Sequence, residues 1–273
     1  MNKKEGTKEK IVNLENLIMM KIDLKKVEGQ ILAKGITKIT YVSLERSKLT
    51  TEQLNILMKE IVEGECLILD DLRMGGVNLK DVNTEAIAKA FTKLRRIDIT
   101  DTEMNKNQMI EWSKEVVSAD TLTLEEVRMT RVNLSGVEPQ MLAAAILRMK
   151  RMDADSTDMT TMQVDTLTDM FWRKENQRLT NFGMKGINLR QVNTGMLAQM
   201  IHKLEVIDIR RTNMEQGQQT IIFERIIKED KLPTIIMDMI GFPGVENRYV
   251  NKLMATLKID QWWVQIHRAP VTM

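Results

Sequence analysis

The feature that most constrains this chain is an internal period of 55 residues. Several classes of residue recur at this interval without an insertion. The recurring sets are the leucines Leu24, Leu79, Leu134 and Leu189, the valines Val27, Val82, Val137 and Val192, the alanines Ala33, Ala88, Ala143 and Ala198, and the glutamines Gln53, Gln108, Gln163 and Gln218. Because chance does not give unrelated residue classes one shared interval, the period indicates a stack of similar units.

Each 55-residue stretch contains two related units, and each unit predicts a strand followed by a helix. The first unit opens with L-x-x-[LVF]-x-M-x-x-[VI]-x-L, as at 69–79, and the second with L-x-x-I-x-I-x-x-T-x-M, as at 94–104. Apolar residues at alternate positions of such an opening favour a strand with one buried face. After the opening, apolar residues recur every three or four positions, as in Leu142, Ile146 and Met149, which is typical of a helix.

Helix starts are marked at the expected places. Thr50-x-x-Gln53 and Thr160-x-x-Gln163 are capping-box patterns. Pro139 falls where the first residue of a helix is expected.

Ten openings organise the chain into a single solenoid. They begin at Leu14, Ile39, Leu69, Leu94, Leu124, Met149, Leu179, Leu204, Thr234 and Leu257. We therefore expect a polar segment at 1–11, one solenoid at 12–264 and a tail at 265–273. The last two units are degenerate, and the stretch 234–245 with Trp262 and Trp263 predicts a C-terminal cap.

A repeated strand–helix unit of about 25 to 30 residues resembles the leucine-rich repeat. The long helices make it most similar to the ribonuclease-inhibitor type, which also occurs in NLR-type intracellular receptors. The resemblance implies a right-handed α/β horseshoe with parallel strands on the concave face and helices on the convex face.

The ninth position of the opening departs from the family pattern of Asn or Cys. Aliphatic residues at Ile22, Val77, Val132 and Ile187 alternate with hydroxyl residues at Ser47, Thr102, Thr157 and Thr212. We expect these hydroxyls to form a partial substitute for the family's hydrogen-bonded ladder.

Composition excludes several classes of function. Forty basic residues against 38 acidic ones give a net charge of +2, which argues against a nucleic-acid partner. The single cysteine, Cys66, excludes an internal disulfide and favours a reducing, cytoplasmic location. No apolar stretch approaches the roughly 18 residues of a membrane span, and no signal peptide precedes the repeats.

No group of residues predicts catalysis, a metal site or a cofactor. The 22 methionines mostly occupy core positions of the repeat. The acidic run 153–158 lacks the Gly and Glu of a calcium loop, and the two histidines lie far apart. We therefore expect a non-enzymatic protein that holds neither a metal nor a cofactor.

The candidate binding residues lie on the predicted concave face. Its fifth-position row alternates in charge through Arg73, Asp98, Arg128 and Asp153. The third-position row alternates in the opposite phase and the second-position row follows it, through Asp71, Arg96, Glu126 and Arg151 and through Asp70, Arg95, Glu125 and Lys150. This alternation has two interpretations. Opposite charges on neighbouring strands satisfy one another and keep the face soluble, or the pattern selects a complementary partner.

Both ends of this face interrupt the alternation. At the N-terminal end, the aromatic Tyr41 stands beside Asn16 and Ile18. At the C-terminal end, Gly183 and Gly186 leave shallow space next to a predicted basic group. That group consists of Lys185, Arg210 and Arg211.

Two functions remain open at this stage. The first is a protein-interaction module, namely an adaptor, inhibitor or ligand-sensing segment that binds a protein on its concave face. The second is a GTPase-activating or other enzyme-regulating protein, which would act through polar residues on the strand-to-helix loops.

Overall fold

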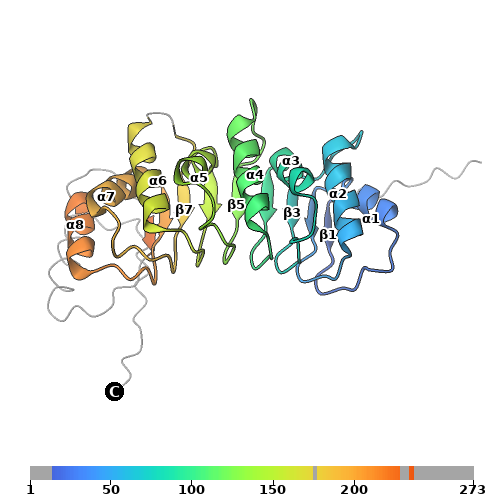
Figure 1. Ribbon diagram of the computed structural model, residues 1–273, viewed down its shortest axis with the longest axis horizontal. Helices are drawn as coiled ribbons and strands as arrows, with labels where there is room; N and C mark the ends of the chain where they lie inside the picture. Colours follow the sequence, from blue (N-terminus) through green and yellow to red (C-terminus); the bar gives the residue numbers. More distant parts are fainter. Residues whose placement is uncertain (1–13, 175–176, 228–233, 237–273) are drawn as a thin grey trace, which may run out of the picture.

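The computed structural model describes residues 14–174, 177–227 and 234–236, which fold as an α/β solenoid (Figure 1). In these residues nine strands form one parallel sheet in chain order. The strands are β1 (Asn16–Ile18), β2 (Tyr41–Ser43), β3 (Asp71–Arg73), β4 (Arg96–Asp98), β5 (Glu126–Arg128), β6 (Arg151–Asp153), β7 (Asn181–Gly183), β8 (Val206–Asp208) and β9 (Thr234–Ile236). The predicted α/β solenoid with a parallel sheet is confirmed.

One helix follows each of the first eight strands. The helices are α1 (Gly29–Ile36), α2 (Thr51–Glu63), α3 (Thr84–Lys93), α4 (Lys106–Ser118), α5 (Pro139–Ile146), α6 (Thr161–Arg173), α7 (Thr194–Lys203) and α8 (Gln216–Ile227). Each helix packs against the next along the chain, so the helices form one layer beside the sheet (Figure 1). None of the helices in the described ranges is long and apolar enough to cross a membrane.

The two faces of the sheet differ in burial. From β2 to β8, the middle residue of each strand is at most 2% exposed and packs toward the helices. The residues on either side of it point to the opposite face, because side chains alternate along a strand. We call this opposite side, formed by the third and fifth positions of each opening, the open face.

The predicted register is confirmed for eight of the ten openings. Their third to fifth positions form β1 to β8. The ninth prediction is wrong by two residues, because Val206 pairs with Thr234, which makes Leu232 rather than Thr234 the start of that opening. The cause is a spacing two residues shorter than in the earlier repeats. The opening at Leu257, the cap beyond residue 236 and the terminal segments 1–11 and 265–273 lie outside the described residues.

The core runs through the stack as one continuous cluster. Leu79, Leu134 and Leu189 are 0% exposed, as their shared period predicts. Methionines at the sixth position are equally buried, which confirms their packing role at Met74, Met129 and Met184. Trp112 replaces a leucine of the repeat and is 1% exposed.

A glutamine on every second helix ties neighbouring units together. In α4, the side-chain oxygen of Gln108 accepts from the backbone N–H of Asn105 at 2.8 Å and completes a capping box. Its side-chain nitrogen donates to the carbonyls of Leu79 and Val82 in the preceding unit, both at 2.8 Å. Equivalent pairs of bonds to the preceding unit are made by Gln53, Gln163 and Gln218. The capping boxes predicted at Thr50 and Thr160 are confirmed.

The hydroxyl residues of the ninth position do not form the expected ladder. Thr102 and Thr157 each donate at 2.7 Å to the carbonyl three residues earlier in the same turn. Thr212 does the same at 2.8 Å. Ser47 does reach the neighbouring unit, where its hydroxyl donates to Met19 and accepts from Ile22 N–H. Three of the four hydroxyls therefore close their own turn, since a short side chain bonds most readily to nearby backbone.

Candidate protein-binding surface

The middle of the open face has the predicted neighbours. The strand register places Asp98 between Arg73 and Arg128, and Asp153 beyond Arg128. Neighbouring members of this row are therefore about 4.8 Å apart along the sheet.

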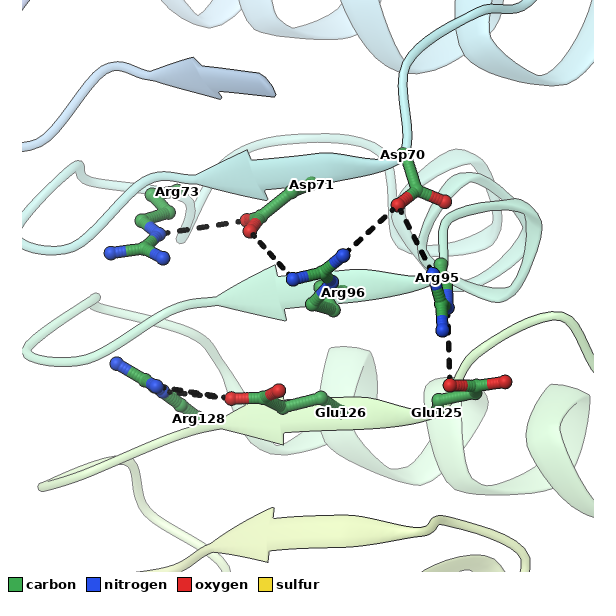
Figure 2. Close-up of polar contacts among 8 residues, drawn as sticks. All are labelled: Asp70, Asp71, Arg73, Arg95, Arg96, Glu125, Glu126 and Arg128. Carbon is green, nitrogen blue, oxygen red and sulfur yellow. Dashed lines mark hydrogen bonds and ion pairs between the residues drawn. The ribbon is translucent and has the colours of Figure 1, made fainter. Parts of the chain in front are cut away.

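The ion pairs of the fifth-position row differ from the prediction, whereas pairs between strands form in the second- and third-position rows, as Figure 2 shows. Arg73 contacts Asp71 of its own strand at 3.5 Å, and Arg128 contacts Glu126 of its own strand at 3.1 Å. No ion pair joins two of the four fifth-position residues. The pairing predicted along that row is wrong.

Arginines in the second and third positions make the contacts between strands. Arg96 lies 3.4 Å from Asp70 and 4.0 Å from Asp71 (Figure 2). Arg95 lies 3.1 Å from Glu125, which directly precedes β5, and 4.0 Å from Asp70, which directly precedes β3. The hydrogen bond to Glu125 raises the pKa of Arg95. The charges in the middle of the open face thus satisfy one another.

The fifth-position aspartates accept hydrogen bonds from the backbone of their own turns, which explains why they do not form ion pairs along the row. The Asp98 carboxylate accepts from the backbone N–H of Thr100 at 2.9 Å. Asp153 accepts from Asp155 N–H at 3.0 Å, and Asp208 from Arg210 N–H at 3.1 Å. An aspartate that bonds its own backbone two residues on forms an Asx turn. These carboxylates shape the end of the strand, and those of Asp98 and Asp153 form no ion pair with the arginines of the fifth-position row.

The N-terminal end of the open face combines an aromatic ring, an arginine and apolar side chains. The guanidinium of Arg73 lies 4.9 Å from the centre of the Tyr41 ring. Ile18 on the next strand is 62% exposed, and Met20 is 44% exposed. We call these four residues the N-terminal patch. Tyrosine and arginine are enriched among the residues that contribute most to protein–protein binding.

The C-terminal end of the open face contains a hollow of about 230 Å³ between β5 and β8. Four carboxylates line it, from Glu126, Asp153, Asp155 and Asp208, together with the guanidinium groups of Arg128 and Arg151. Gly183 forms part of its floor, and a β-carbon there would come within 2.9 Å of Asp155 Oδ1 and 3.2 Å of Asp153 Oδ1. We call the part of it formed by Asp153, Asp155, Gly183 and Asp208 the acidic hollow. The glycine leaves room for the carboxylates to approach one another.

The predicted basic group does not line this hollow. Arg210 turns toward Asp208, with 2.9 Å between Nε and Oδ1. Lys185 contributes its backbone N–H, which donates to Asp155 at 2.8 Å. Arg211 is exposed on the loop after β8. The surface at this end is therefore acidic in the hollow, with Lys185 and Arg211 outside its lining.

Asp155, in the turn after β6, has a raised pKa. Burial and the charge of Asp153 raise its pKa to about 6, and Asp208 adds to this effect. The N–H bond from Lys185 and its ammonium act in the opposite direction. Sequence reasoning did not select Asp155, although the acidic run 153–158 was a visible signal of it.

The described residues contain no group of three histidine, cysteine, aspartate or glutamate side chains arranged to hold a metal ion. Cys66 is exposed on the loop before β3. Neither the protein-family models nor the curated proteins give a match to this chain.

Proposed function

We propose that this chain is a leucine-rich-repeat protein of the ribonuclease-inhibitor type and a non-enzymatic module that binds a protein partner on its open face. The observation that supports the proposal most is the acidic hollow. It is part of a depression in an exposed sheet surface that gathers four carboxylates, from β5, β6, the turn after β6 and β8, beside two arginines. Such a depression accepts a protruding side chain of a partner.

The charges of the hollow define the chemistry of that side chain. Burial, and after it the negative charges of Asp153 and Asp208, raise the pKa of Asp155, so a cation placed beside it would stabilise its charged form. Arg128 and Arg151 also line the depression. A partner that fits therefore presents a lysine or arginine to Asp155 and an acidic residue toward these arginines. Complementary patterns of this kind raise specificity more than affinity.

The N-terminal patch offers a second contact. Ile18 and Met20 provide apolar area, while Tyr41 and Arg73 form a stacked pair at the surface. A partner segment lying along the open face reaches both the patch and the hollow. The self-paired charges between them, such as Arg96 with Asp70, then exclude segments of a single charge sign.

A peptide selection on the purified protein tests this proposal. We expect a phage-displayed random peptide library selected on the wild-type protein to be enriched in lysine and arginine. Binding of the selected peptides should weaken in Asp155→Asn and with added salt. Asp120→Asn, a neutralisation at an exposed site remote from the hollow, is the matched control. Selection of peptides without basic residues, or equal binding to both variants, would contradict the proposal.

The enzyme-regulating alternative has less support. An activating residue on the strand-to-helix loops needs a side chain that is available to another protein. On that edge Arg131 is held by both carboxylate oxygens of Asp101. This pairing lowers the pKa of Asp101, chiefly through the hydrogen bond from Arg131.

A further inference from the structure

Arg73 on β3 is held differently from Arg128, which occupies the same position of the repeat on β5. The guanidinium of Arg73 lies 4.9 Å from the centre of the Tyr41 ring and contacts Asp71 through Nε at 3.5 Å. Among the described residues, no group accepts a hydrogen bond from its terminal nitrogens Nη1 and Nη2, and Figure 2 draws no contact to them. Arg128 instead uses both Nε and Nη2 on Glu126, at 3.2 and 3.1 Å. Arg73 is therefore oriented on one side and available for bonding on the other.

The ring of Tyr41 and the carboxylate of Asp71 together fix the fork formed by Nη1 and Nη2. They come from neighbouring strands, where the register sets Tyr41 opposite Asp71 and Ser43 opposite Arg73. A guanidinium that is already stacked on an aromatic face loses little freedom when it binds a ligand. A planar fork with two parallel N–H donors matches the two oxygens of a carboxylate.

The charge of Arg73 is only partly neutralised. Asp71 is its sole ion-pair partner in the part of the chain that the structure describes, and the same carboxylate lies 4.0 Å from Arg96. One carboxylate therefore faces two guanidinium groups. The side chain of Arg73 is 32% exposed, whereas that of Asp71 is 9% exposed. A second carboxylate can thus approach Arg73 from solvent while Asp71 keeps its place.

A buried hydroxyl beside Arg73 indicates the same kind of ligand. Ser43 is 1% exposed, and its Oγ has no hydrogen-bond partner among the described residues. It lies on the open face of β2 with Tyr41, because the buried Val42 between them faces the helices. The register places Ser43 between Ile18 and Arg73, about 4.8 Å from each neighbouring strand. A buried hydroxyl without a partner is unfavourable, so an acceptor that arrives beside Arg73 would satisfy it.

We propose that Arg73, supported by Tyr41 and Ser43, receives a side-chain carboxylate of the partner protein through Nη1 and Nη2. This inference rests on the proposed function and specifies the partner further. A carboxylate suits the site better than a phosphate, because Asp71 and Asp98 are close enough to act on the charge of Arg73. A phosphate carries nearly two negative charges at neutral pH and would meet stronger repulsion from them.

The register also sets the spacing between this carboxylate site and the acidic hollow. Asp153 lies three strands along the sheet from Arg73, which is about 14 Å. An extended segment covers this distance in about four residues. A partner segment that crosses the strands therefore carries a carboxylate at one end of such a span and a lysine or arginine at the other.

Double-mutant cycles with peptides selected on the purified full chain from the phage-displayed library test this site. Replacing the acidic residue of a selected peptide by its amide should weaken binding to the wild-type protein by at least about fivefold. The same replacement should change binding to Arg73→Gln by less than about twofold, because the guanidinium is absent there. Arg73→Lys should resemble Arg73→Gln, since an ammonium keeps the charge but not the fork. The control Lys59→Gln, at a side chain 71% exposed on α2, should leave the peptide effect unchanged.

Further variants separate this site from the rest of the open face. Tyr41→Leu removes the ring and should reduce the peptide effect, whereas Tyr41→Phe keeps the ring and should preserve it. An acidic residue that couples to Arg151→Gln instead, or a peptide that binds more tightly with phosphoserine in its place, would overturn this inference and leave the proposed function intact. Peptides that depend on Asp155 but contain no acidic residue would do the same. A selection that yields no binding peptide would overturn both. Melting curves by circular dichroism verify that all variants are folded.

Discussion

The helix-facing side and the open face of the sheet follow different rules. On the helix-facing side the same residue type returns in every unit, as Leu79, Leu134 and Leu189 do, each 0% exposed. On the open face the fifth position changes from Ile18 through Arg128 to Gly183. Each unit must fit its neighbours on the buried side, whereas no layer constrains the open side. We therefore expect the repeated buried residues to determine the stability of the fold. We expect partner binding where the residues of the open face differ from unit to unit.

The largest expected effect compares one substitution at two equivalent positions. Leu124→Ala removes a side chain that is 0% exposed, and we expect a loss of about 2–5 kcal/mol in the free energy of unfolding. Leu14→Ala, two periods earlier and 50% exposed, should lose less than about 1 kcal/mol in dilute protein. Urea unfolding followed by circular dichroism measures both. Equal losses would show that the end of the solenoid is covered after all.

The glutamines provide the next largest test of the buried side. Gln108→Met keeps a similar volume but leaves the carbonyls of Leu79 and Val82 without their donor. We expect a loss of about 2–4 kcal/mol, because each buried acceptor left unpaired costs about 1–3 kcal/mol. Gln140→Met, at an exposed position of α5, should stay within about 0.5 kcal/mol. A small loss at position 108 would mean that water replaces the amide.

The buried side was largely predictable from the sequence, because residues that must pack against the neighbouring units keep the same type in every repeat. The alternation of Leu69, Leu72 and Met74 determined the strand register, and the capping-box pattern at Thr160 determined a helix start. The ninth strand was misplaced because two residues are missing from that repeat, although Leu232 and Ile235 keep the pattern. The second pair of bonds made by each glutamine has no sequence signal, since its acceptors are backbone carbonyls.

The open face was predictable in position, but the pairing along its fifth-position row was not. The register correctly made Arg73 and Asp98 neighbours. It does not reveal that Asp98 bonds the N–H of Thr100 while Arg73 reaches Asp71 on its own strand. Local backbone bonds compete with ion pairs for the same carboxylate, and the spacing of charges alone does not decide between them.

Asp155 allows a pH test of the open face. Its pKa of about 6 in the folded protein exceeds the usual value near 4, so the folded state binds this proton more tightly. Protonation therefore stabilises the fold at low pH, and that contribution is lost as the pH rises through about 6. Asp155→Asn imitates the neutral form and keeps an acceptor for Lys185 N–H.

At pH 7 we expect Asp155→Asn to be more stable than wild type by about 1 kcal/mol, a value reduced for the solvent that reaches this half-buried group. The advantage should disappear as the pH falls to about 4. Urea unfolding at a series of pH values measures it. An advantage that does not vary with pH would assign the effect to packing instead of charge.

The smallest effects separate the two accounts of the charged rows. If charges pair between strands through the third position, Arg96→Glu should weaken the fold by about 0.5–1 kcal/mol at low salt, since it faces Asp70 and Asp71 with a third carboxylate. The loss should shrink with added salt. Asp98→Asn should change stability by less than about 0.5 kcal/mol, because the amide oxygen still accepts from Thr100 N–H and preserves the turn. Pairing along the fifth position predicts the reverse order, with a salt-dependent loss at Asp98. Thermal melting of both variants at two salt concentrations therefore decides which row holds neighbouring strands together, and a larger loss in Asp98→Asn would return that role to the fifth position.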